Sequence, residues 1–175
     1  AGWIAAVVTE KGRIACDSVV LAGGVWSRLF CRSLGIRLPQ LKVLSSVMRT
    51  EPLAGGPETS ASGPGFGLRK RLDGGYTVAS WSGNVHDIVP DTLRFAADFM
   101  PALRHQIGGL RLRLGGPFLR ELAEPSGWKL DDVSPFEKTR VLDPPAYAPI
   151  LKQAQTSLTA AFPVFHTMRI AESWG

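Results

Sequence analysis

The chain has 175 residues, 45% of them hydrophobic, and its 20 basic and 15 acidic residues leave a net charge of +5. This length suffices for one well-buried domain, and no apolar stretch approaches the roughly 18 residues that a membrane-spanning helix needs. The two cysteines, Cys16 and Cys31, form no disulfide framework or metal pair, so we expect a soluble protein of a reducing compartment, cytoplasmic and without a membrane partner.

The N-terminal segment predicts a β-hairpin that leads into a short helix. Apolar, β-branched runs indicate strands at 3–9 and 13–21, and the second run ends at the pair Gly23–Gly24. Ser27 is placed to cap the helix that follows, and Gly35 is placed to end it.

The central segment predicts a strand, a long loop and a second hairpin. Residues 41–53 are typical of a strand, whereas residues 54–67 hold five glycines and two prolines and are typical of a mobile loop. The pair Asp73–Gly74 is the strongest hairpin signal in the chain and predicts an antiparallel hairpin over residues 68–81.

The C-terminal half alternates helices and strands. We expect a helix over 90–107 that Pro101 kinks or divides, a half-buried strand at 110–114, a helix at 118–123, an extended segment at 137–142, a helix over 146–161 and a strand at 165–170. Together the elements predict an α+β fold, a mostly antiparallel sheet with helices packed on one face.

Isolated motifs give weak signals. Ser82, His86 and Asp87 invite comparison with a catalytic triad, but the glycines of a nucleophile elbow are absent and a turn is the better interpretation. Arg111 and Arg113 suit either an anionic pocket or a solvated strand face. The three histidines lie too far apart to bind a metal together, so no metal site is expected.

The glycine turn at residues 22–26 is a stronger candidate. Small residues let a ligand approach the backbone closely, and the N-terminus of the following helix offers unpaired N–H groups. A tight strand-to-helix turn also requires glycine, so spacing alone leaves a ligand site and a plain turn equally favoured.

Residues 19–27, VVLAGGVWS, followed by Leu29 and Leu34–Gly35, resemble a segment of FAD-dependent oxidoreductases of the D-amino-acid oxidase, glycine oxidase and sarcosine oxidase family. Further segments match in order: Arg49–Pro52 after a strand, Asp73–Gly75 in a hairpin, Arg140–Pro144 before a long helix, and Phe162–Pro163 with Arg169–Gly175 at the end. The resemblance covers essentially the whole chain.

The resemblance implies that residues 1–38 form the edge of a FAD-binding domain and residues 39–175 a substrate-binding domain. It implies an oxidoreductase that oxidises the C–N bond of a small amine or amino acid by passing a hydride to flavin. It also implies site residues: Ala22, Gly23, Gly24 and Trp26 would flank FAD, and Arg49, Arg169 and Trp174 would face the substrate. No catalytic residue is identified.

The glycine-rich fingerprint that holds the ADP part of FAD in this family is missing from the chain, as is the family's C-terminal FAD segment. We therefore expect a piece of a longer enzyme that is inactive by itself and binds no FAD alone. Alone, the piece is expected either to self-associate through residues 3–30 or to leave that region poorly ordered.

Two other classes of function stay open at this stage. A non-catalytic binding or assembly module would have the same pattern of elements, and the flavin content of the full-length protein distinguishes it from an enzyme. The positive charge also suits a nucleic-acid-binding domain, but basic residues are scattered except at Arg69–Arg71, so nucleic acid is the less favoured partner.

Overall fold

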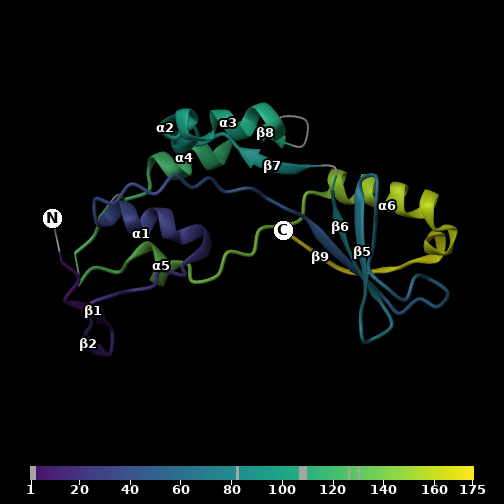
Figure 1. The fold of residues 1–175 in the computed structure, drawn as a ribbon, viewed down its shortest axis with the longest axis horizontal. Helices are drawn as coiled ribbons and strands as arrows, with labels where there is room; N and C mark the ends of the chain where they lie inside the picture. Colours follow the sequence, from purple (N-terminus) through teal and green to yellow (C-terminus); the bar gives the residue numbers. More distant parts are fainter. Residues whose placement is uncertain (1–2, 82, 107–109, 126, 130) are drawn as a thin grey trace. The chain divides into compact units, whose positions relative to one another are not determined.

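The computed structural model describes residues 3–81, 83–106, 110–125, 127–129 and 131–175. The chain divides into two compact units: unit 1 comprises residues 1–41 and 123–140, and unit 2 comprises residues 42–122 and 141–175 (Figure 1). These bounds differ from those of the expected domains, because residues 123–140 return to pack beside the first segment. No helix in the described ranges is long and apolar enough to cross a membrane.

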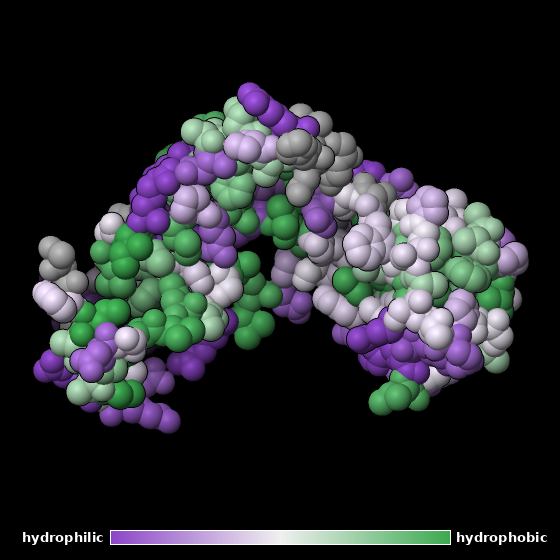
Figure 2. All heavy atoms as spheres, in the orientation of Figure 1, coloured by the Kyte–Doolittle hydropathy of each residue, from purple (hydrophilic) through white to green (hydrophobic). Residues whose placement is uncertain are grey.

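Unit 1 begins with the predicted hairpin, formed by β1 (Ala6–Thr9) and β2 (Gly12–Ala15). The expected strand over 13–21 is wrong beyond Ala15, since residues 17–21 pair with no strand in the part of the chain that the structure describes. Their side chains are exposed, and Figure 2 shows hydrophobic residues, in green, gathered on the surface of this unit.

The helix of unit 1 lies where the sequence predicts it. The 3-10 helix η1 (Gly24–Trp26) leads into α1 (Ser27–Ser33), and Gly35, with a φ of +71°, ends it. The expected role of Ser27 as the cap is wrong: Ser27 is the first helical residue, and Trp26 occupies the N-cap position.

Unit 2 is built on a five-stranded antiparallel sheet in the order β4-β5-β6-β3-β9. The strands are β3 (Val47–Thr50), β4 (Ala61–Gly63), β5 (Phe66–Lys70), β6 (Tyr76–Ser80) and β9 (Ile170–Trp174). The hairpin predicted over 68–81 is confirmed as β5 and β6, and Gly74 has a φ of +82° in its turn. The expected loop at 54–67 is interrupted by β4, which pairs with β5.

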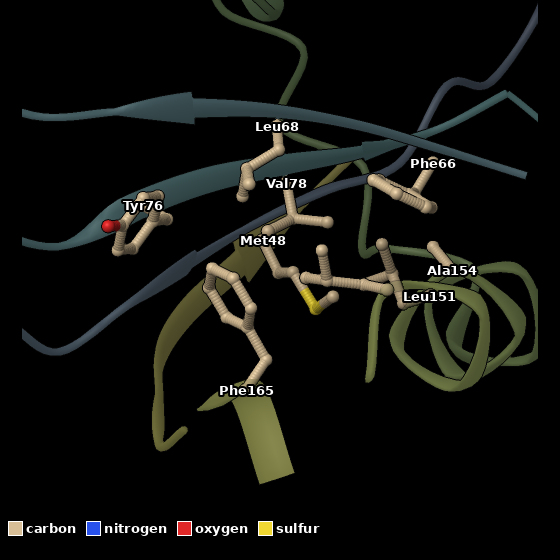
Figure 3. Packing of buried hydrophobic residues seen from close by; sticks show 9 residues of the cluster. Met48, Phe66, Leu68, Tyr76, Val78, Leu151, Ala154 and Phe165 are labelled. Carbon is tan, nitrogen blue, oxygen red and sulfur yellow. The ribbon is translucent and has the colours of Figure 1, made fainter. Parts of the chain in front are cut away.

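One face of this sheet is covered by α6 (Ala148–Ala161) and the 3-10 helix η3 (Pro163–Thr167). Alternate residues of the strands point into this core, which Figure 3 shows from close by. The core consists of Met48, Phe66, Leu68, Tyr76, Val78, Leu151, Ala154, Leu158 and Phe165. The predicted α+β class, with helices packed on one face of an antiparallel sheet, is confirmed.

The rest of unit 2 holds β7 (Asn84–Asp87), α2 (Pro90–Arg94), α3 (Ala96–Gln106), β8 (Leu110–Arg113) and α4 (Gly116–Leu122). The expected helix over 90–107 divides at Phe95, not at Pro101, because the buried Phe95 leaves helical geometry with a φ of −105° and a ψ of 12°. The strand expected at 110–114 is β8, which among the described residues pairs with β7 alone, in a two-stranded parallel sheet; Leu110 is half-buried, but the rest of β8 is exposed, contrary to the expected half-buried strand.

Two C-terminal expectations need correction. Phe165 is fully buried within η3, so the final strand begins at Ile170 and not at residue 165. The segment expected to be extended from residue 137 starts inside α5 (Pro135–Lys138), which a reciprocal capping interaction between Ser134 and Glu137 initiates.

Candidate functional site

The loop before α1 holds the four residues that the resemblance assigns to the cofactor: Ala22, Gly23, Gly24 and Trp26. Gly24 has a φ of +53°, which favours glycine, and a Cβ atom there would meet nothing within 4 Å. A Cβ atom at Gly23 would lie 3.3 Å from Ser27 Oγ. Because Ala22 and Gly24 are exposed, a flat group can approach the backbone of this loop closely.

The expected unpaired N–H groups at the start of α1 are partly engaged, through Gln40. The backbone N–H of Arg28 donates to Gln40 Oε1 over 3.1 Å, and Gln40 Nε2 donates to the carbonyl oxygen of Gly24 over 3.0 Å. One side chain therefore holds the glycine turn against the first turn of the helix. The N–H of Arg28 is therefore not free for a phosphate, which requires unpaired N–H groups at a helix N-terminus.

Trp26 is anchored by an aromatic cluster of unit 1. Its ring meets Phe136 edge-on, with centroids 5.6 Å apart, and Phe136 also contacts Phe30 at 6.0 Å and Trp128 at 5.1 Å. Such pairs stabilise beyond the area that they bury. The contacts hold the loop before α1 to residues 123–140, and no sequence spacing signals them because the partners lie about a hundred positions apart.

In unit 2, the sheet face that points away from α6, here called the outer face, carries two rows of side chains. Directly paired residues of antiparallel strands point to the same face, so the strand register defines the rows. One row is polar and consists of Arg69, Thr77, Arg49 and Glu172. The other is small or apolar and consists of Gly67, Ala79, Val47 and Trp174.

The structure brings together two of the three residues expected to face the substrate, Arg49 and Trp174. Arg49 Nε lies 2.8 Å from Glu172 Oε2, so the two side chains form an ion pair. The direction of the N–H does not meet hydrogen-bond geometry. Arg169 lies just before β9, where its carbonyl oxygen accepts a hydrogen bond of 2.9 Å from the N–H of Glu51 and its side chain is exposed. Arg169 is therefore outside the two rows.

A depression of about 380 Å³ opens on the outer face over β4, β5 and β6. Its lining includes Ser60, Ser62, Gly67, Arg69, Thr77 and Trp81. The indole of Trp81 lies so close to Gly67 that a Cβ atom there would collide with the ring nitrogen. The sequence analysis noted Arg69 only as part of the basic run at residues 69–71, and it did not connect Trp81 or Gly67 with a site; the available signal was a glycine between two core residues of a strand.

His86 has a structural role. It is buried in β7, with Nδ1 2.8 Å from the carbonyl oxygen of Lys42 and Nε2 2.9 Å from Thr92 Oγ1. Because a carbonyl oxygen only accepts, Nδ1 donates to Lys42. The expected turn at His86 and Asp87 is therefore a strand, and Ser82 lies outside the described residues.

The two arginines of β8 each have a partner. Arg113 donates to both carboxylate oxygens of Asp87, over 2.6 and 2.9 Å, and this interaction lowers the pKa of Asp87 below its usual range. Arg111 donates to Gln153 over 2.8 Å. Within the described part of the chain, no group of three metal-ligating side chains is present, and both cysteines are free thiols.

Comparison with known proteins identifies the family. The family model for FAD dependent oxidoreductases matches residues 1–174. The chain is similar to the L-amino acid deaminase from Proteus myxofaciens, solved in complex with anthranilate, at 36% identity and a TM-score of 0.89, over 98% of this chain and 38% of that one. It is also similar to the L-amino acid deaminase from Proteus vulgaris, at 31% identity and a TM-score of 0.86, over 99% of this chain and 40% of that one.

No curated protein matches the chain. The chain spans about two fifths of the length of the two solved deaminases. The family match over residues 1–174 agrees with the resemblance seen at residues 19–27. The chain therefore belongs to the family of FAD-dependent oxidoreductases.

Proposed function

We propose that this chain is the substrate-side part of a FAD-dependent enzyme that oxidises the C–N bond of an amino acid. The observation that carries the proposal is the agreement of nearly the whole chain with the L-amino acid deaminase fold, at a TM-score of 0.89 and 36% identity. Unit 2 supplies the substrate side in this proposal, and unit 1 supplies the edge of the cofactor side.

In the proposal, Ala22, Gly23, Gly24 and Trp26 flank FAD. When bound, FAD accepts the hydride that leaves the substrate carbon. The absence of a side chain at Gly24 lets the ring system come close to the backbone. Trp26, packed against Phe136, keeps the loop in position for that contact.

On the substrate side, the proposal assigns Arg49, Arg169 and Trp174. A guanidinium group recognises a carboxylate by charge and by paired hydrogen bonds. Glu172 stands 2.8 Å from Arg49, so the pair presents both charges that complement the two ends of an amino acid. Trp174 lies in the neighbouring apolar row and suits an apolar side chain, while the exposed Arg169 is a second cation near the edge strand β9.

The test uses the full-length protein that contains this chain. We expect a yellow preparation whose flavin absorbance bleaches when an L-amino acid is added without oxygen. A colourless protein that no amino acid or amine reduces after FAD is added would contradict the proposal and favour the binding-module alternative. Bleaching by amines but not by amino acids would restrict the substrate class instead.

A matched pair of variants tests the cofactor side. Gly24 and Gly35 both have positive φ, of +53° and +71°, and neither has an atom within 4 Å of a Cβ position. Gly24→Ala and Gly35→Ala therefore add comparable backbone strain, of about 1 kcal/mol. We expect only Gly24→Ala to lower FAD content in the purified protein; equal losses in both variants would remove this loop from the cofactor site.

A further inference from the structure

We propose that the depression on the outer face of the sheet binds a planar organic carboxylate, with Arg69 as the anion anchor and Trp81 as the stacking wall. The proposal rests on the proposed function and deepens it, because it names residues that select among substrates. It depends on three observations in unit 2: a cation that no acidic group of the described residues pairs with, an exposed indole and the space that a glycine leaves.

Arg69 is the cation that the depression offers to a ligand. In the basic run at residues 69–71, Lys70 Nζ pairs with Glu58 at 2.6 Å and Arg71 pairs with Asp73 at 2.8 Å. Arg69 is exposed, and no acidic group in the described residues pairs with it. Its guanidinium therefore keeps the two parallel donors that a carboxylate accepts.

Trp81 provides a flat apolar wall beside this cation. The residue follows β6, and its backbone N–H donates to the carbonyl oxygen of Gly65 over 3.2 Å, which fixes the end of the strand. Its side chain is 69% exposed although it lines the depression. An exposed indole can stack on a planar ligand and gain energy beyond simple apolar burial.

Gly67 makes this arrangement possible. Any side chain at Gly67 would collide with the Trp81 ring, so the indole can lie over β5 only because this position has no Cβ atom. Arg69 is two residues further along the same strand and on the same face, about 7 Å away. A ligand whose carboxylate meets Arg69 can thus direct its planar part toward Trp81.

The volume of the depression agrees with a small ligand. At about 380 Å³ it falls near the lower end of the usual range for small-molecule sites, roughly 300–1,000 Å³. Ser60 and Ser62 add hydroxyl groups to its lining, which can complete the hydrogen bonds of a carboxylate or an amino group. The cation and hydroxyl groups of the lining therefore suit the acid group of a ligand, and the indole suits its ring.

The experiment measures the binding of three probes to the full-length protein by calorimetry: benzoate, cyclohexanecarboxylate and benzamide. Benzoate has both the charge and the flat ring, whereas each of the other probes lacks one of them. We expect benzoate to bind most tightly. Arg69→Met should weaken benzoate about tenfold or more, which corresponds to the loss of one charge-assisted hydrogen bond.

Lys70→Met is the matched control. It removes an equal charge from the next position of the same strand, where the side chain points to the other face, and it should leave benzoate binding unchanged. Trp81→Ala should abolish the preference for benzoate over cyclohexanecarboxylate. Gly67→Ala should do the same, because the added methyl group displaces the indole while Arg69 stays.

Two outcomes would overturn the proposal: equal weakening by Arg69→Met and Lys70→Met, or an unchanged benzoate preference in Trp81→Ala. Flavin reduction by amino acids, measured on the same preparations, separates this proposal from the proposed function. If amino acids reduce the flavin but the Arg69 variant binds benzoate normally, only the site assignment fails. If Arg69→Met loses benzoate but no amino acid reduces the flavin, only the proposed function fails.

Discussion

The sheet of unit 2 and the N-terminal segment of unit 1 use their apolar residues in opposite ways. In unit 2, Tyr76, Val78 and Leu158 are 0% exposed, because α6 and η3 cover one face of the sheet. In unit 1, Trp3 is 94% and Val20 is 92% exposed, and no layer of the described residues covers them. Unit 2 thus completes its own core, whereas unit 1 presents an apolar surface of the kind that another protein surface or domain covers.

The difference extends to the two candidate sites. The loop at Gly23–Gly24 is held by the side chain of Gln40 and by the packing of Trp26 on the ring of Phe136. The outer face of the sheet is backed by a packed core, so Arg49 and Arg69 project from a rigid support. We therefore expect substitutions in unit 2 to affect global stability and substitutions in unit 1 to act locally.

The largest expected effect is from Leu158→Ala in α6. The side chain is fully buried in the core of unit 2, so its loss should lower the free energy of unfolding by about 2–5 kcal/mol. Val20→Ala in unit 1 is the control, with an expected change within about 0.5 kcal/mol, since the residue is 92% exposed. Chemical denaturation measures both, and similar losses would contradict the comparison.

A smaller effect is expected from Phe136→Ala, which removes the ring shared by Trp26, Phe30 and Trp128. The cost should be about 2 kcal/mol, less than for a fully buried ring, because Phe136 is only half-buried. Hydrogen exchange should show faster exchange in α1 and unchanged exchange in β5 and β6. Faster exchange in both regions would mean that the units unfold together.

Ser134→Ala should cost about 1 kcal/mol. The variant removes the hydroxyl that accepts from the N–H of Glu137 over 3.3 Å, and with it one half of the capping interaction that starts α5. Proteolysis of residues 123–140 in the folded protein reports the loss. Ser134→Thr, which keeps a hydroxyl that accepts from the N–H of Glu137 and donates to Glu137 Oε2, should behave like the native chain, and equal sensitivity of both variants would rule out capping as the cause.

The smallest effect concerns pH and Asp73 in the β5–β6 turn. Hydrogen bonds from Arg71 and from the N–H of Gly75 lower the pKa of Asp73 from 3.8 to about 2. Since the folded pKa is below the unfolded one, the stabilisation is complete above pH 3.8 and is lost as the pH falls toward 2. An NMR titration of the carboxyl carbon measures this pKa. A value near 3.8 would show that Arg71 and the N–H of Gly75 do not stabilise the Asp73 carboxylate.

Local signals in the sequence predicted local structure well. Asp73–Gly74 predicted its hairpin, since the turn needs the positive φ that Gly74 adopts, and the apolar spacing of residues 146–161 predicted α6 at Ala148–Ala161. The strand expected at 13–21 ended early, because a strand exists only where a neighbour supplies hydrogen bonds. The break at Phe95, where the backbone leaves helical geometry, is not signalled by the spacing of apolar residues.

The sequence by itself determined the α+β class and, through residues 19–27, the family to which the chain belongs. Only the tertiary structure decided which side chains share a surface. Strand register placed Arg49 opposite Glu172, residues 123 positions apart, and placed the Trp81 indole over Gly67. Hydrogen bonding between strands creates such neighbours, and the spacing of residues along the chain does not show which strands will pair.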